Sequence, residues 1–100
     1  MSLLSKTEIK KKIETLEGWN YTNNSIYKEY TFDSYMDGIQ YINQLAVKAE
    51  ENNHHPDIFV GWCEINLAFT SHDHGGVTQL CLRMAQEADK IFLGGNFIRS

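Results

Sequence analysis

The only proline of the chain, Pro56, separates two segments of different periodicity. Before it, apolar residues recur every three or four positions over residues 35–51, which predicts an amphipathic helix. After it, apolar and polar or small residues alternate over residues 64–69, the pattern of a half-buried strand. Because proline disfavours helical geometry in the residue before it, the helix has to end ahead of His55. Such a chain folds into a mixture of helices and strands.

The N-terminal third predicts a short helix followed by a hairpin. Residues 5–8 read SKTE, a capping box, and apolar residues at helical spacing follow as far as Gly18, a residue typical of helix ends. Residues 19–32 are rich in aromatic and β-branched side chains, and the pair Asn23 and Asn24 interrupts them as a turn. Three residues are candidate N-caps of the next helix: Thr31, Asp33 and Ser34.

The second half predicts two strands and a third helix. Residues 58–72 hold the strands, with a turn between Gly61 and Glu64. A glycine-rich loop follows, then an apolar stripe of helical spacing over residues 77–92, and residues 94–100 close the chain as a frayed tail. We therefore predict one α+β domain over residues 1–100, in two layers: a four-stranded antiparallel sheet with three helices on one face, in the order α-β-β-α-β-β-α.

Composition and charge exclude some classes of function. Nine basic and thirteen acidic residues give a net charge of −4, which argues against nucleic acid as a partner, since phosphate binding needs clustered Lys and Arg. The single basic run, residues 10–12, is expected to be a solvated helix face.

The cysteines and the apolar segments indicate a compartment. Cys63 and Cys81 form no CxxC pair, and Cys81 lies on an apolar helical stripe, which favours a place in the core. Residues 1–12 lack the apolar stretch of a signal peptide, and no segment approaches the ~20 apolar residues of a membrane span. We expect reduced thiols, a cytoplasmic location and no membrane association.

All four histidines, His54, His55, His72 and His74, fall within residues 54–74. The first pair precedes the third predicted strand and the second pair follows the fourth. If those two strands form an antiparallel hairpin, both pairs lie at its open end. The sequence therefore predicts that the histidines meet.

Three interpretations of this cluster remain open from the residues alone. The histidines are solvated residues at element ends, or metal ligands, or acid–base groups. A metal site is disfavoured by adjacent histidines that diverge and by the absence of a zinc-type cysteine spacing. Acid–base chemistry is favoured because neutral and protonated imidazole coexist near neutral pH, so a histidine pocket supplies both donor and acceptor. Four nearby carboxylates are available to orient them: Glu50, Glu51, Asp57 and Asp73.

Residues 50–78, EENNHHPDIFVGWCEINLAFTSHDHGGVT, resemble the pterin-4a-carbinolamine dehydratase family, also described as dimerisation cofactors of hepatocyte nuclear factor. The shared pattern is an acidic residue, three positions, His-His-Pro, an aromatic residue six places after the proline, and a histidine ten places further on. The matching residues are Glu50, His54, His55, Pro56, Trp62 and His72. The GW pair at residues 18–19 and the aromatic hairpin after it extend the resemblance over most of the chain.

The resemblance implies a reaction and a site. Members of the family dehydrate 4a-hydroxytetrahydropterin to quinonoid dihydropterin without metal or organic cofactor, recycling the tetrahydrobiopterin of aromatic amino acid hydroxylases. On this chain it makes His54 and His72 the acid–base candidates, with His55 mainly binding and orienting the substrate. It also implies further substrate-binding positions: Glu50, Pro56, Trp62, Ser71 and Asp73. For Trp62, wall of the pocket and simple core packing are equally open.

The chain departs from the family pattern at three positions. Ser71 replaces the threonine usual before the last histidine, and His74 is additional and receives no role. Three residues after Thr78, where the family commonly has an aspartate, this chain has Cys81. The loss of that aspartate is expected to weaken the start of the third helix or the support of the site.

Two expectations concern partners. The uncovered face and the edge strands of a four-stranded sheet favour self-association, so we expect a homodimer or homotetramer. The alternative function is a protein-binding module, because some members of the resembling family serve as dimerisation cofactors or coactivators of a homeodomain transcription factor.

Overall fold

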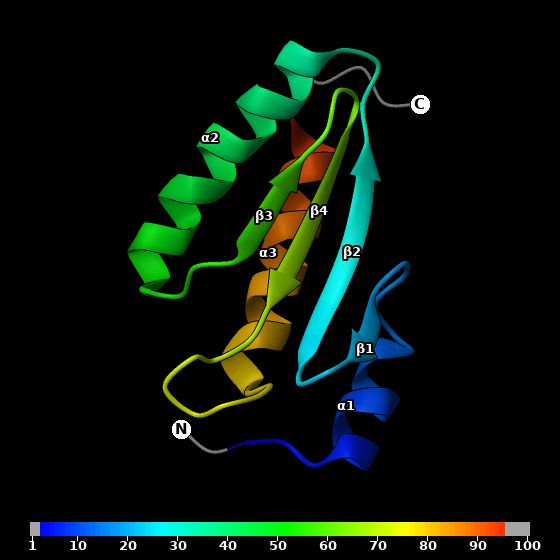
Figure 1. The fold of residues 1–100 in the computed structure, drawn as a ribbon, viewed down its shortest axis with the longest axis vertical. Helices are drawn as coiled ribbons and strands as arrows, with labels where there is room; N and C mark the ends of the chain where they lie inside the picture. The colour runs from blue at the N-terminus through cyan, green and yellow to red at the C-terminus, as the bar shows by residue number, and fades with distance from the viewer. Residues whose placement is uncertain (1–2, 96–100) are drawn as a thin grey trace.

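The computed structural model describes residues 3–95. Its elements follow the predicted order, α-β-β-α-β-β-α, and confirm the α+β fold (Figure 1). They are α1 (Lys6–Ile13), β1 (Asn20–Thr22), β2 (Ser25–Thr31), α2 (Tyr35–Asn52), β3 (Asp57–Val60), β4 (Glu64–Phe69) and α3 (Gln79–Gly94). Part of the predicted tail, residues 96–100, lies outside the described residues, and Gly94 belongs to α3 instead.

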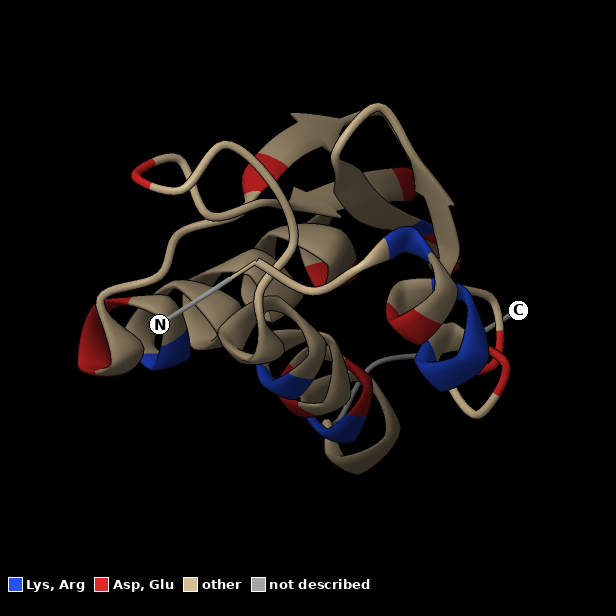
Figure 2. Cartoon of the chain, turned by 90° about the horizontal axis from the view of Figure 1, so that it is seen from below, with Lys and Arg blue, Asp and Glu red and all other residues tan. Residues whose placement is uncertain are grey.

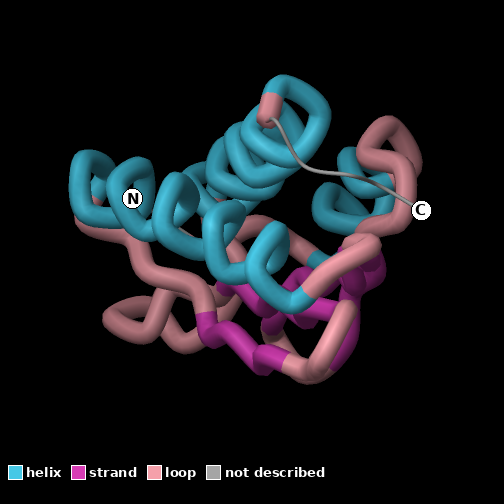
Figure 3. Tube along the Cα trace, turned by 90° about the horizontal axis from the view of Figure 1, so that it is seen from above, coloured by secondary structure: helices cyan, strands magenta, loops and turns pink. Residues whose placement is uncertain are grey.

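The four strands form one antiparallel sheet in the order β1-β2-β4-β3. In the central pair, Ile26 of β2 lies opposite Phe69 of β4, and Tyr30 lies opposite Ile65. All four of these side chains are at most 2% exposed, because they point to the face that the helices cover. Figure 3 shows the helices on one side of the strands, which gives the two predicted layers.

The first hairpin turns at the predicted asparagine pair. Asn23 and Asn24 have φ angles of 49° and 66°. Two consecutive residues with positive φ are what a two-residue hairpin turn requires, and asparagine tolerates that region better than most residues. The turn sets the register of β1 on β2, with Tyr21 opposite Ile26.

The long helix α2 begins and ends at residues that the sequence marks. Of the three candidate caps, Ser34 is the N-cap, and its hydroxyl accepts a bond of 3.1 Å from the backbone N–H of Asp37. At the other end Asn53 adopts a left-handed conformation, with φ 48°, and its N–H bonds to the carbonyls of Ala49 and Glu50. The chain leaves the helix there and reaches β3 through Pro56.

The predicted end of the first helix at Gly18 is wrong. The capping box of Ser5 and Glu8 is present, but α1 ends at Ile13 and a series of turns follows. Both the N–H and the hydroxyl of Thr15 bond to the Lys12 carbonyl, three residues back, which draws the chain out of the helical path. Gly18 still makes the reversal, with φ +85°.

The core lies between the sheet and helices α2 and α3 and is rich in aromatic rings. Its largest members are packed ring to ring, as in Tyr30 with Tyr41 at 5.2 Å and Phe32 with Tyr41 at 5.5 Å between centroids. Helix α3 contributes a fully buried stripe: Cys81, Met84, Ala85 and Ala88. The predicted core position of Cys81 is thus confirmed, and both cysteines are free thiols.

One carboxylate on α3, that of Asp89, accepts hydrogen bonds from three polar side chains. Asp89 accepts bonds from the indole Nε1 of Trp19 at 3.1 Å, from Nζ of Lys28 at 2.9 Å and from the hydroxyl of Tyr30 at 2.5 Å. Burial, above all, raises the pKa of the Tyr30 phenol, so it stays a neutral donor. The three donors come from β2 and the segment before β1, so Asp89 ties α3 to the sheet.

The outer surfaces match the remaining expectations in part. The basic run of residues 10–12 is exposed on α1, where Figure 2 colours it blue. Strands β1 and β3 form the edges of the sheet, and Tyr27 and Phe59 on its uncovered face are 39% and 64% exposed. Self-association through these surfaces stays a prediction.

Within residues 3–95, no helix has both the length and the apolar character needed to cross a membrane.

Candidate active site

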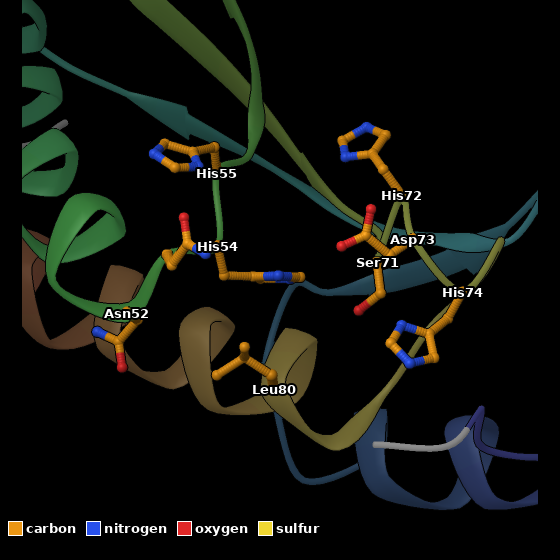
Figure 4. Close-up of a pocket in the computed structure, with 9 residues that line it drawn as sticks. Asn52, His54, His55, Ser71, His72, Asp73, His74 and Leu80 are labelled. Carbon is orange, nitrogen blue, oxygen red and sulfur yellow. The ribbon is translucent and has the colours of Figure 1, made fainter.

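The β3–β4 hairpin brings the two histidine pairs together, as its predicted topology requires. Asp57, at the start of β3, lies opposite Ala68, near the end of β4. His54 and His55 precede that end of β3, and His72 follows β4 (Figure 4). The side chains surround a cleft of about 450 Å³, a size typical of small-molecule sites. Its lining residues are Asn52, Asn53, His54, His55, Ser71, His72, Asp73, His74 and Leu80.

His54 is the buried member of the cluster. Only 8% of the residue is exposed, and its ring stacks on Phe69 of β4 with 6.0 Å between centroids and 9° between planes. Its Nε2 lies 3.3 Å from the thiol of Cys81 on α3. The interpretation that the histidines are merely solvated residues at element ends is therefore wrong for His54, whose ring position is set by contacts on two sides.

The environment of His54 favours its neutral form. Burial lowers the pKa of the imidazole below the ordinary 6.5, and the positive charges available to His72 and His55 lower it further. At neutral pH the ring therefore carries one hydrogen and one lone pair, and so it is able to donate and to accept.

The free energy of unfolding should decrease as the pH is lowered, because of the His54 ring. A histidine whose pKa is lower in the folded than in the unfolded state makes folding most favourable above the unfolded value near 6.5. As pH falls below that value, the unfolded chain binds a proton that the folded chain resists, so the free energy of unfolding decreases. Urea unfolding at pH 7.5 and pH 5.5 should show this loss, and the His54→Gln variant should show a smaller one. An equal loss in the variant would contradict the role of His54.

The other two histidines of the family pattern are exposed and lie next to carboxylates. Nε2 of His55 contacts the Glu50 carboxylate at the end of α2. Nε2 of His72 lies 4.0 Å from the carboxylate of Asp57 at the start of β3. Each contact is an ion pair whenever the imidazole holds its second proton, and the closer contact, with Glu50, orients the ring of His55.

The glycine-rich loop after β4 holds the far wall of the cleft. The N–H of Ser71 bonds to the Gly76 carbonyl, and the Ser71 carbonyl accepts from the N–H groups of His74 and Gly75. This closed turn needs the positive φ of Gly75, +73°, which a side chain would oppose. The hydroxyl of buried Ser71 meets that of Thr78 at 2.7 Å. The loop thereby presents His72, Asp73 and His74 along the cleft.

Trp62 does not join this cleft. It lies in the turn between β3 and β4 and is 80% exposed, so the expectation of core packing is wrong. It lines a separate pocket with Thr31, Phe32, Cys63 and Glu64, and a role in substrate binding stays a prediction. The whole length of β4, about 20 Å for six residues, separates that turn from Ser71. Glu50 and Pro56 are also absent from the lining, and they adjoin the cleft through His55.

The structure adds residues that the sequence pattern did not select. Asn52, Asn53 and Leu80 line the cleft, and Cys81 contacts His54. One feature of the sequence could have indicated Cys81, since it stands where the resembling family commonly has an aspartate. Its place on an apolar helical stripe favoured the core and gave no indication of a polar contact. For a metal, the part of the chain from residue 3 to 95 holds no group of three or more His, Cys, Asp or Glu placed to bind an ion.

Comparisons with known proteins show the family of the chain. The sequence model of the family described as pterin 4 alpha carbinolamine dehydratase matches residues 2–91. The chain belongs to this family. Two relatives are each named "Putative pterin-4-alpha-carbinolamine dehydratase". The one from Nostoc punctiforme is 35% identical, covering 89% of this chain and 96% of its own, and the one from Sulfolobus acidocaldarius is 32% identical, covering 88% and 97%.

Solved structures of the dehydratase family share the fold. The crystal structure of a transcriptional coactivator/pterin dehydratase from Brucella melitensis superposes with a TM-score of 0.86 at 25% identity, covering 90% of this chain and 98% of its own. A pterin dehydratase-like protein identified as a RuBisCO assembly factor in the alpha-carboxysome gives a TM-score of 0.61 at 20% identity, covering 73% and 84%, which is a likeness of fold alone.

Proposed function

We propose that this protein is a 4a-hydroxytetrahydropterin dehydratase, which releases water from the hydroxylated pterin to give quinonoid dihydropterin by histidine acid–base catalysis. The observation that carries the proposal is the convergence of His54, His55 and His72, from two segments of the chain, on one cleft. Family membership supplies the reaction class. A volume of about 450 Å³ suits a bicyclic heterocycle with its hydroxyl.

The reaction needs one donor and one acceptor of a proton. The bond between C4a and oxygen breaks with its electron pair on oxygen, which takes up a proton and leaves as water. N5 loses its proton, and the electrons of the N5–H bond form the double bond to C4a. No electron is gained or lost overall, so the balance asks only for proton transfer, which imidazoles supply near neutral pH.

Residues of the cleft divide these tasks. His54 and His72 face the substrate as the acid–base pair, one from each side of the cleft. His55, oriented by Glu50, binds the ring edge, and Asp57 lies near His72. Asp73 and Ser71, on the loop after β4, complete the polar wall of the cleft. Tetrahydrobiopterin recycling is the setting in which this activity is useful.

A direct assay tests the proposal. Purified protein is mixed with chemically generated 4a-hydroxytetrahydropterin, and the quinonoid product is followed by absorbance. We expect the rate to rise in proportion to protein concentration above the spontaneous rate, and to be unchanged after treatment with a chelator. A rate independent of protein concentration would overturn the proposal, and loss of activity on chelation would overturn its metal-free chemistry.

A protein-binding role is the second candidate, and one surface favours it. Exposed apolar side chains, Phe59 at 64% and Trp62 at 80%, lie on β3 and the turn that follows, and the turn is at the end of the β3–β4 hairpin opposite to His72. The Brucella melitensis protein is titled a transcriptional coactivator as well as a dehydratase. Binding of a partner there should survive alanine at His54 and His72, whereas dehydration should not.

A further inference from the structure

A series of buried polar side chains in contact with one another runs from the start of α3 to the ring of His54. The hydroxyls of Thr78 and Ser71 lie 2.7 Å apart, and Ser71 Oγ lies 3.5 Å from the thiol of Cys81. That thiol lies 3.3 Å from Nε2 of His54. Thr78 and Cys81 are fully buried, and Ser71 and His54 are 7% and 8% exposed. This series of side chains is thus shielded from water along its length.

The hydroxyl of Thr78 takes part in this series of contacts and does not cap α3. It occupies the N-cap position of α3, where a threonine hydroxyl normally accepts from the first turn of the helix. Here it makes no such bond and contacts Ser71 instead. The start of α3 therefore contributes the side chains of Thr78 and Cys81 to the series of polar contacts that ends at His54.

The contact lengths favour one direction of hydrogen bonding along these side chains. The Thr78 hydroxyl donates to Ser71, the Ser71 hydroxyl donates to the Cys81 sulfur, and the thiol hydrogen then points at His54. In this direction every hydrogen has an acceptor. In the opposite direction, with Nε2–H donating to sulfur, the last hydrogen falls on Thr78, whose remaining contact is the Cys81 sulfur at 3.8 Å. Sulfur is a weak acceptor and this contact is long, so a buried hydroxyl would be poorly satisfied, which favours the first direction.

We propose that Cys81 is a positioning residue, which fixes His54 as the neutral tautomer with its hydrogen on Nδ1. The inference rests on the proposed function for its consequence. His54 then donates a hydrogen bond to the departing oxygen, and His72 takes the N5 proton and passes it to the hydroxide that leaves, which gives water. A neutral imidazole that donates to a reacting oxygen is an established catalytic role.

The groups around His54 agree with a neutral ring. Cys81 faces it from α3, Phe69 from β4, His72 from the loop after β4, and His55 from its own segment. None of these is a carboxylate. An aspartate at position 81 would accept from Nε2 and stabilise the imidazolium, which a thiol does not do.

Nuclear magnetic resonance of the whole protein labelled with 15N-histidine tests the inference without any turnover. Two-bond proton–nitrogen spectra identify the tautomer and the titration of each ring, and the His54→Gln variant assigns His54. We expect the hydrogen of His54 on Nδ1 in the wild type and in Cys81→Ser, which keeps a donor. In Cys81→Ala that preference is lost, and in Cys81→Asp the titration of His54 moves to higher pH. Cys63→Ser, at the far end of the hairpin, is the matched control.

Several results would overturn the inference: a wild-type His54 with its hydrogen on Nε2, or a ring state unchanged in Cys81→Ala. If Cys81→Asp fails to fold in a thermal melt, the serine and alanine variants decide. The pH profile of kcat/KM adds a second readout, since the ionisation of His54 should move with the spectra in Cys81→Asp. A wild type that shows the expected tautomer but no dehydration would remove the proposed function and leave the role of Cys81 intact.

Discussion

Replacing His54 or His72 by alanine should lower kcat/KM for dehydration by about 10²–10⁴, because each change removes one of the two groups that move protons or donate to the leaving oxygen. The two imidazoles approach the cleft from different segments, so neither variant leaves a substitute in place. Stopped-flow absorbance of the quinonoid product measures the effect. Far-ultraviolet circular dichroism at pH 7.5 should show that both variants keep their secondary structure.

His74→Ala is the matched control for these variants. His74 is exposed at the rim of the same cleft, and the family pattern gives it no counterpart. We expect its kcat/KM to stay within about threefold of the wild type, since surface substitutions without partners have small effects. Full activity in His54→Ala or His72→Ala would refute the acid–base assignment, and an equal loss in all three variants would show that the cleft responds to any histidine removed.

Replacing Asp89 by alanine should lower the free energy of unfolding by about 3–5 kcal/mol. The change leaves the Lys28 ammonium, the Tyr30 hydroxyl and the Trp19 indole N–H without their shared acceptor. The Tyr30 residue is 2% exposed, so water cannot replace the lost bond without entering the core. Urea unfolding followed by tryptophan fluorescence measures the loss, and Asp89→Asn should be destabilised less because the amide retains an acceptor.

Glu87→Ala provides the comparison on the same helix. Glu87 pairs with Lys90 at 3.8 Å on the outside of α3, and the lysine side chain is 77% exposed. An exposed pair at this spacing contributes about 0.3–0.5 kcal/mol, so the variant should be nearly as stable as the wild type. Equal stability of the Asp89 and Glu87 variants would show that Asp89 does not tie α3 to the sheet.

The elements themselves were predictable because they depend on local patterns. The stripe that ends before Pro56, the asparagine pair of the first hairpin and the alternation in β4 each act over a few residues. The end of α1 was not predicted, because Thr15 competes for the Lys12 carbonyl, and a side-chain bond of that kind leaves no periodic signal.

Part of the site was predictable, because strand pairing in one hairpin brings its residues together. The meeting of His54 and His55 with His72 follows from one antiparallel hairpin, so sequence order and strand pairing suffice. Trp62 falls in the predicted turn at the closed end of the same hairpin, so the hairpin already argued against a place for it on the cleft at the open end.

The sequence by itself determined the α+β order, the hairpin and the pairing of the histidines, since these are set by periodicity and by residues with special backbone preferences. Only the tertiary structure decided that the Cys81 thiol meets His54 and that Asp89 accepts from three donors. Such contacts join segments that are far apart in the chain. They depend on how α3 is rotated and seated on the sheet, which the packing of the whole core fixes and no local pattern records.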